Sequence, residues 1–260
     1  PHRPLLLARP QLDPTTPTRG LRVDRRTVRQ STGPVDAPDF TIVTAPVSKV
    51  DFKKTLDSYR AKRGEFRTIE VPVVQYLQID GHGDPNTSPE FVAAIEALYP
   101  VAYKLKFVSK IDLGRDYVVP PLEGLWWAEN MDAFTAARDK SRWNWTLLLM
   151  VPDWIDHAMF AEAVDAVRAK GRPTGPTRLA GPAGLDHVRM EALHEGLCVQ
   201  TLHVGTFDAE AEILHHLHHD VIPSRGLELR GKHHEIYLSD FRRTSAEKQR
   251  TILRQPVSAT

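Results

Sequence analysis

The pattern of hydrophobic and polar positions predicts an alternation of strands and helices from about Thr41 to the end of the chain. Runs rich in β-branched and aromatic residues are typical of strands. Such runs predict strands at residues 67–80, 116–128, 142–151, 190–204 with an interruption near 195–196, and 227–238, the last as a strand or a hairpin. Strand-type runs thus recur along most of the chain.

Helical spacing and helix-start residues appear between these runs. They predict helices at residues 48–63, from Ser88 onward, at 156–170, and from Asp208 through His219. Pro100 is expected to kink or restart the second helix, because proline cannot donate a backbone hydrogen bond. Thr244 and Glu247 have capping-box spacing, which predicts a short C-terminal helix.

The order of these elements favours an α+β fold. After the first helix the order is β-α-β-β, a connecting helix and then β-α-β, which suggests two related halves. Strands and helices that do not alternate as regular βαβ units favour an antiparallel sheet over a parallel one.

Residues 1–38 differ from the rest of the chain. They contain seven prolines and show little periodicity, so we expect a flexible Pro/Arg-rich leader followed by one domain at residues 39–260. Residues 1–39 hold seven Arg and four Asp, a net charge of +3, whereas the whole chain carries +1. The positive charge is therefore concentrated in front of a nearly neutral domain.

Composition argues against several classes of protein. The longest apolar run, residues 146–151, is far shorter than the ~20 residues that span a bilayer, so no membrane partner is expected. No basic stripe with interleaved aromatic residues crosses the domain, so direct nucleic-acid binding is not expected. The single cysteine, Cys198, excludes an internal disulfide and is typical of the reducing cytoplasm.

Four of the five tryptophans lie within twenty residues of one another, on two predicted strands. Because alternate side chains of a strand share a face, Glu123 and Trp127 should point one way and Trp126 the other. Trp143 and Trp145 should share a face of the next strand. These residues either form an aromatic core or line a pocket for a flat ligand, and the carboxylate on the same strand favours the pocket.

Another predicted strand places a carboxylate beside a phenol. Glu235 and Tyr237 should share a strand face with His233, while Ile236 and Leu238 point to the core. Two residues along a strand span roughly 6.6 Å, so the carboxylate and the phenol can touch opposite ends of a small reacting group. The alternative is a partly exposed polar strand face.

The histidine-rich segment at residues 215–219 raises the question of a metal site. If the apolar stripe of the helix contains Leu217 and Val221, His215 and His219 form an i, i+4 pair on the solvent face. Such a pair can bind zinc, but no third ligand and no H-E-x-x-H motif accompanies it. We therefore expect a solvated surface, with no metal and no cofactor.

Several segments together resemble the stand-alone GyrI-like proteins. They are residues 122–127, 195–205, 233–240 and 247–257. The resemblance covers about residues 40–257, and Glu235 matches the strand glutamate of the family. It implies two pseudo-symmetric β-α-β-β modules that form an antiparallel sheet, with helices on one side and a ligand cleft between the modules.

The resemblance also implies a hydrophobic or aromatic small molecule as the partner. Some relatives are effector-binding domains of multidrug-responsive activators, in which a buried glutamate meets cationic aromatic drugs. A subgroup of stand-alone members resembles hydrolases that open the cyclopropane ring of DNA alkylators and protect the cell. The chain has no recognisable helix-turn-helix segment, so it is similar to the stand-alone type.

The first hypothesis is an enzyme that hydrolyses the strained cyclopropane or epoxide ring of an aromatic genotoxin. Glu235 would activate water as a general base, with a pKa raised by burial. Tyr237 or Glu123 would donate a hydrogen bond to the oxygen that gains charge. The residues expected to contact the ligand are Trp126, Trp127, Trp143, Trp145 and His233.

The second hypothesis is a non-catalytic protein that binds or sequesters cationic aromatic compounds. An ionised Glu235 would pair with the cation, and the aromatic side chains would add cation–π attraction. A third hypothesis, suggested only by the family name, is an interaction protein that acts on a macromolecule such as a topoisomerase.

Deletion of residues 1–38 should leave the melting temperature and the ligand affinity unchanged, because their composition offers little apolar surface to pack on a domain. Thermal melts of the full and shortened chains test this directly. A melting temperature lowered by several degrees would show that the leader packs on the domain.

Overall fold

The computed structural model describes residues 48–129, 139–170, 182–240 and 243–260. The predicted leader at residues 1–38 lies outside these ranges. Within them, no helix combines the length and the apolar character that crossing a membrane requires.

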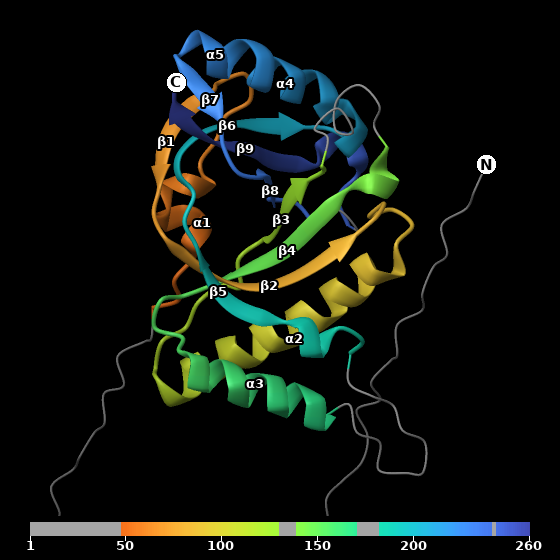
Figure 1. Cartoon of the computed structure of the whole chain (residues 1–260). Helices are drawn as coiled ribbons and strands as arrows, with labels where there is room; N and C mark the ends of the chain where they lie inside the picture. Colours follow the sequence, from red (N-terminus) through yellow and green to blue (C-terminus); the bar gives the residue numbers. More distant parts are fainter. Residues whose placement is uncertain (1–47, 130–138, 171–181, 241–242) are drawn as a thin grey trace, which may run out of the picture. The chain divides into compact units, whose positions relative to one another are not determined.

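An antiparallel sheet forms the centre of the fold (Figure 1). Its strands are β1 (Arg67–Val71), β2 (Val74–His82), β3 (Leu122–Trp127), β4 (Asn144–Val151), β5 (Arg189–Leu193), β6 (Gly196–Val204), β8 (His233–Tyr237) and β9 (Arg250–Ala259). They are hydrogen-bonded in the order β1-β6-β9-β8-β3-β4-β2-β5, and β7 (Leu227–Leu229) pairs with β9. The predicted α+β fold with an antiparallel sheet is confirmed.

The sheet has two halves, which meet where β3 pairs with β8. One half is β3-β4-β2 and the other is β8-β9-β6. Each half is built from one β-α-β-β unit. Strands that hold the same position in the two units lie equally far from the junction. The helix of the first unit is α2 (Pro89–Asp112), and that of the second is α4 (Glu210–His216). At the junction, Gly124 is paired with Glu235 and Trp126 with His233. Two motifs more than a hundred residues apart are therefore adjacent.

The longer helices cover one face of this sheet. Ala97, Leu98 and Val101 of α2 are fully buried in the cluster that contains the inner side chains of β2 and β4. Outside α2, α3 (His157–Lys170) buries Ala163 and Val167 in the same cluster. These contacts form the core under the first half of the sheet.

A second helical segment covers the other half. It consists of η5 (Phe207–Ala209), α4, the π-helical turn η6 (Leu217–Val221) and α5 (Ile222–Ser224). Leu217 and Ile222 are fully buried against residues of β6 and β9. The predicted helix from Asp208 to His219 thus extends to Ser224, and the Thr206 side chain caps its start by accepting a hydrogen bond from the Ala209 N–H.

α2 continues through Pro100 without the predicted interruption. Leu98 before the proline and Val101 after it are both fully buried. Burial of the same helical face on both sides of Pro100 outweighs the loss of one backbone hydrogen bond at an exposed position.

The first predicted helix, at residues 48–63, is not continuous. It consists of two short turns, α1 (Phe52–Thr55) and η1 (Asp57–Tyr59). The second turn is held against the sheet, because the Tyr59 hydroxyl donates a hydrogen bond to the buried Glu123 carboxylate. A tertiary contact therefore overrides the local periodicity.

The segments predicted as strands at residues 67–80 and 227–238 each contain two strands in the structure. The strand predicted at residues 67–80 is divided at Pro72 into β1 and β2, which lie in opposite halves of the sheet. The strand or hairpin predicted at residues 227–238 is β7 and β8, and both pair with β9 rather than with each other.

β9 occupies the region where a short C-terminal helix was predicted. The capping-box segment forms only one turn, η7 (Ala246–Lys248). From Thr251 to Val257 every residue is buried, and β9 is paired with β6 on one edge and β8 on the other. The helix prediction is wrong because pairing on both edges outweighs a local capping signal.

A buried network of ionised groups lies on the sheet face opposite the long helices. The His234 imidazole lies between two carboxylates, with Nε2 2.9 Å from Glu123 Oε2 and Nδ1 2.9 Å from Glu195 Oε1. Arg254 pairs with Glu195 at 2.8 Å. Burial alone would lower the pKa of His234, but Glu195 and Glu123 raise it to about 9. Two positive and two negative charges therefore compensate one another inside the protein.

Glu195→Gln should destabilise the fold strongly, because Arg254 and His234 lose their shared carboxylate. Breaking a buried ion pair costs about 3–5 kcal/mol. Asp165→Asn, which removes an exposed pair with Arg168, should cost less than about 1 kcal/mol. Denaturant unfolding measures both free energies, and equal losses in the two variants would contradict the prediction.

The same network should make stability depend on pH. The folded pKa of His234 is raised, so its contribution is complete below about pH 6.5 and is lost as the pH rises towards 9. The unfolding free energy of the wild type should fall across that window. Glu195→Gln should make the fall shallower, and an unchanged slope would show that His234 is not held charged by Glu195.

Candidate functional site

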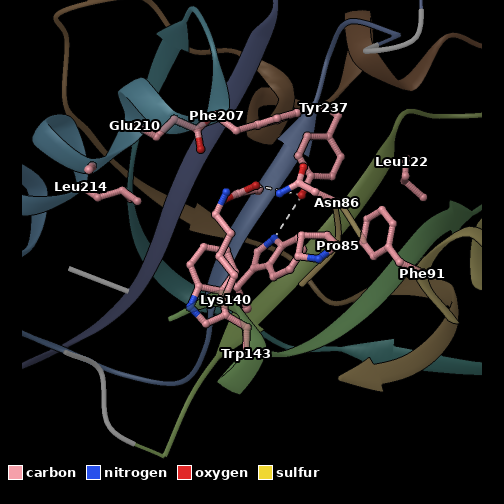
Figure 2. A pocket seen from close by; sticks show the side chains of 13 residues that line it. Pro85, Asn86, Phe91, Leu122, Lys140, Trp143, Phe207, Glu210, Leu214 and Tyr237 are labelled. Atoms are coloured by element: carbon pink, nitrogen blue, oxygen red, sulfur yellow. Dashed lines mark hydrogen bonds between the residues drawn. The ribbon is translucent and has the colours of Figure 1, made fainter. Parts of the chain in front are cut away.

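A pocket lies on the helix-covered face of the sheet, between the start of α2, the start of α4 and the β3–β8 junction (Figure 2). It encloses about 140 Å³. A cavity of roughly 150 Å³ can hold a benzene-sized ring, so the enclosed part has room for one aromatic ring. The pocket is lined by Pro85, Asn86, Phe91, Leu122, Trp126, Lys140, Trp143, Phe207, Glu210, Ala211, Leu214, Glu235 and Tyr237.

Aromatic rings form one wall of this pocket. Trp126 stacks on Phe91 with ring centroids 6.1 Å apart, and it meets Trp143 edge-on at 5.7 Å. Trp145 is fully buried behind Phe91, which it contacts edge-on at 5.2 Å. A Cβ added at Gly81 would lie 2.0 Å from the Trp145 ring. Glycine at that position therefore makes room for the indole that supports the wall.

A chain of polar groups lies in the same pocket (Figure 2). Trp126 Nε1 donates to the Tyr237 hydroxyl at 3.1 Å, and that hydroxyl donates to Glu235 Oε2 at 2.8 Å. Burial raises the pKa of Glu235 to about 7, although the hydrogen bond from Tyr237 opposes this. Burial and the nearby carboxylate raise the pKa of Tyr237 well above 10, so the phenol stays neutral. Glu235 is thus poised to exchange a proton near neutral pH.

Two further ionisable side chains line the pocket. Lys140 belongs to η3 (Lys140–Arg142) and pairs with Asp208 at 3.1 Å, and its charge lowers the pKa of Glu235 to a small extent. Glu210 is 4% exposed and lies at the start of α4, where its charge raises the pKa of Tyr237. The pocket therefore contains two carboxyl groups and one ammonium group.

The structure brings Glu235, Tyr237, Trp126 and Trp143 together, as the sequence hypothesis required. Two other predicted ligand contacts are not pocket-lining residues. Trp145 is in the core behind the wall. Trp127 follows Trp126 on β3 and does not line the pocket; the Lys232 Nζ lies 3.3 Å from its ring centroid.

Glu123 is also outside this pocket. On β3 it points to the other face, where it accepts a hydrogen bond from Tyr59 at 2.5 Å and pairs with His234. The residue of β3 that lies opposite Glu235 is Gly124. The expectation that Glu123 and Glu235 share one site is therefore wrong, because strand alternation places their side chains on opposite faces.

The predicted histidines are found in two environments. His215 and His219 are exposed with ring centroids 4.5 Å apart, which confirms their surface position. His233, predicted to contact the ligand, is 3% exposed and lies next to His218 behind the pocket. In the part of the chain that the structure describes, no three His, Cys, Asp or Glu side chains converge in a way that would hold a metal ion.

Sequence reasoning missed the pocket residues that helices contribute. Phe91 lies in the helix predicted from Ser88 onward, but a helical pattern does not reveal that its ring borders a cavity. Phe207, Glu210 and Leu214 belong to a helix whose position over the sheet depends on tertiary packing. The apolar spacing of that helix is the only sequence signal for them.

Comparison with known proteins identifies relatives of the chain. Residues 64–257 match the family described as GyrI-like small molecule binding domain. The crystal structure of an uncharacterized conserved protein from Listeria innocua is 36% identical, with a TM-score of 0.70, over 81% of this chain and 100% of that chain. Two crystal structures described as hydrolases from Listeria innocua are 34% and 35% identical over the same shares, with TM-scores of 0.67 and 0.69. The curated proteins gave no match.

Glu235→Gln should stabilise the folded protein at neutral pH. The folded pKa of Glu235 is raised, so its ionisation opposes folding and the wild type should lose stability as the pH rises from about 4.5 to 7. Glutamine removes that loss, which is on the order of 3 kcal/mol. Denaturant unfolding at the two ends of this pH range measures the effect.

Glu212→Gln is the matched control, because Glu212 is an exposed carboxylate on the same helix as Glu210. It should leave the difference between the two pH values unchanged. A Glu235→Gln protein that keeps the wild-type difference would show that Glu235 is not desolvated in solution.

Proposed function

The chain belongs to the GyrI-like small molecule binding domain family, and from this premise we propose that its pocket hydrolyses a strained three-membered ring on a neutral aromatic compound. The observation that carries the proposal is Glu235, a carboxylate with a pKa of about 7 at an aromatic cavity. A general base is most effective when its pKa lies near the working pH. The relatives described as hydrolases support the same reaction class.

The dimensions of the cavity favour a substrate that inserts one ring-sized group. The enclosed volume of about 140 Å³ accommodates the reacting end of an aromatic compound rather than a large polycyclic molecule. Trp126 and Phe91 would stack on that end, and the remainder would extend past Lys140 and Asn86. Aromatic walls hold a flat ligand at low cost in side-chain entropy.

Glu235 would act as the base in the proposed reaction. It takes a proton from a water molecule, whose oxygen attacks a carbon of the strained ring. The ring bond to that carbon breaks, and its electron pair passes to the epoxide oxygen or, for a cyclopropane, to a conjugated carbonyl oxygen. That oxygen takes up a proton from solvent as the product leaves, and Glu235 loses its own proton to solvent, so the net change is the addition of one water.

Tyr237 and Lys140 have supporting roles in this mechanism. The Tyr237 hydroxyl donates to Glu235 Oε2 and so fixes the orientation of the carboxylate. Its pKa is raised well above 10, which keeps the donor protonated throughout. Lys140 carries a positive charge at the pocket and would stabilise the developing oxyanion, the contribution that the sequence hypothesis gave to Tyr237 or Glu123.

Glu210 favours a second candidate function, the binding of cationic aromatic compounds without turnover. A buried second carboxyl group makes the pocket more attractive to a cation than Glu235 alone would. Trp126 and Trp143 would add cation–π attraction. The two functions differ in the charge of the preferred ligand, which makes them separable by experiment.

Incubation with an aromatic epoxide and an aromatic cyclopropane, followed by mass spectrometry, tests for hydrolysis. Glu235→Gln should lower the hydrolysis rate by roughly 10²–10⁴-fold with little change in KM. In the wild type, kcat/KM should rise with pH and level off above an apparent pKa of about 7, because Glu235 must be ionised to act as a base.

Glu212→Gln should keep the wild-type rate, since its side chain is exposed on α4. Thermal melts must show that each variant is folded. Folded Glu235→Gln protein with the wild-type rate would remove Glu235 from the mechanism. Absence of a product one water heavier, together with binding of tetraphenylphosphonium that Glu235→Gln weakens, would favour the cation-binding function instead.

A further inference from the structure

A pair of buried imidazoles lies directly behind Glu235, and neither takes part in the mechanism above. His233 is on the same face of β8 as Glu235, and His218 comes from the π-helical turn η6. They are 3% and 7% exposed, and their ring centroids are 5.8 Å apart. Histidines this deeply buried normally have hydrogen-bond partners on their ring nitrogens.

The ring nitrogens of this pair have no close hydrogen-bond partner in the described part of the chain. Both nitrogens of His233, Nε2 of His218 and Oε1 of Gln255 are buried, and none has a hydrogen bond of normal length and angle there. The Gln255 amide hydrogens are used by the carbonyls of Arg230 and Pro256. A long hydrogen-bonding contact with the Gln255 side chain raises the pKa of both imidazoles, so these three groups form one polar cluster.

His233 is also the nearest of these groups to Glu235. Its Nε2 lies 3.9 Å from Glu235 Oε1, the carboxylate oxygen that Tyr237 does not occupy. A hydrogen bond is about 2.9 Å long, so a movement of about 1 Å or one bridging water would complete the contact. Glu235 thus faces a phenol at one oxygen and an imidazole at the other.

The phenol side cannot carry a proton away. The Tyr237 hydroxyl receives its own hydrogen bond from Trp126 Nε1, and an indole N–H is a donor only. A chain of donors that ends on an indole has no group to pass the proton to. The imidazole side differs, because a neutral imidazole can accept a proton on one nitrogen and release another proton from the second.

The π-helical turn brings this cluster close to the surface. Leu217 and His218 are consecutive residues, and both are buried, whereas the neighbouring His219 is exposed. The charges of His219 and His215 lower the pKa of His218, so both exposed imidazoles lie within electrostatic range of the buried one. π-Helical turns inside helices occur frequently at functional sites.

We propose that His233 and His218 form a proton-transfer route from Oε1 of Glu235 to the exposed imidazoles of His215 and His219. The inference rests on the proposed function: a base that has taken a proton from water must lose it before the next turnover, while the ligand covers the mouth of the pocket. Glu235 gives a proton to His233, which gives one to His218, which releases one towards the surface. Each imidazole ends neutral, so charge and protons balance.

The groups around the route keep both imidazoles neutral at rest. Burial lowers the pKa of His233 and of His218, and His218 lowers that of His233 further. His234 lowers the pKa of His233, while Glu195 opposes this. The hydrogen bond from Tyr237 lowers the pKa of Glu235, as do the charges of His234 and Lys140.

Imidazole tautomers measured by ¹⁵N NMR test the route without a substrate. If His233 is hydrogen-bonded to Glu235, its Nε2 should carry the proton when Glu235 is ionised and lose it when Glu235 is protonated. The tautomer of His233, and with it that of His218, should switch between about pH 6 and 8 in the wild type. Glu235→Gln should abolish the switch. Fixed tautomers in the wild type, or the same switch in Glu235→Gln, would overturn the route.

Turnover of an aromatic epoxide supplies the second measurement. His218→Phe keeps a ring in the buried position but cannot carry a proton, so one fast turnover should be followed by a steady-state rate lower by roughly tenfold to a hundredfold. Added imidazole should restore the rate, which a purely structural defect would not allow. His216→Gln, at an exposed ion pair with Asp220 on the same helix, should behave as the wild type.

The two proposals fail in different ways. Unchanged hydrolysis in Glu235→Gln would remove the proposed function, whatever the tautomers show. Loss of hydrolysis in Glu235→Gln, with a folded His218→Phe protein that shows no burst and the full steady-state rate, would overturn the route and leave Glu235 as the base.

Discussion

The pocket depends on the buried ion pairs of His234, which lie on the other face of the strand that carries Glu235. His234 is held between Glu123 of β3 and Glu195, and Glu195 is held in turn by Arg254 of β9. These contacts connect β8 to both neighbouring strands by charge as well as by backbone hydrogen bonds. Removing any one member would leave the buried charges unbalanced, so the arrangement specifies the register of β8.

That register determines what the pocket contains. In a strand, successive side chains point to opposite faces, so His234 in the network requires Glu235 to face the cavity and Tyr237 to lie on the same side. A shift of one residue would put the carboxylate among the charges of the far face and the imidazole in the pocket. The buried ion pairs of His234 therefore hold Glu235 in the pocket, although the burial of that carboxylate is itself unfavourable.

The sequence was sufficient for the fold class and for the strand-borne part of the site, because both follow from alternation. It predicted that Trp126 and Trp127 point to opposite faces of their strand and that Glu235 and Tyr237 share a face. These predictions depend only on the two-residue period of a strand. It could not place Glu123, because alternation defines two faces without saying which one the cavity occupies. Phe91 and Glu210 depend on how helices pack on the sheet, and β9 depends on pairing with strands distant in sequence.

Gly124 shows why the two strand motifs occur together. It lies opposite Glu235 at the junction of the two halves, and a Cβ there would be 2.8 Å from Trp126 Nε1 and 3.0 Å from the Tyr237 hydroxyl. Any larger residue would therefore separate the indole from the phenol and break the hydrogen bond between Trp126 and Tyr237, whose hydroxyl donates in turn to Glu235. Glu123 beside it belongs to the far network, so two adjacent residues of β3 serve opposite faces. The pocket at the junction thus requires a residue as small as Gly124 on β3 at the position opposite Glu235 of β8.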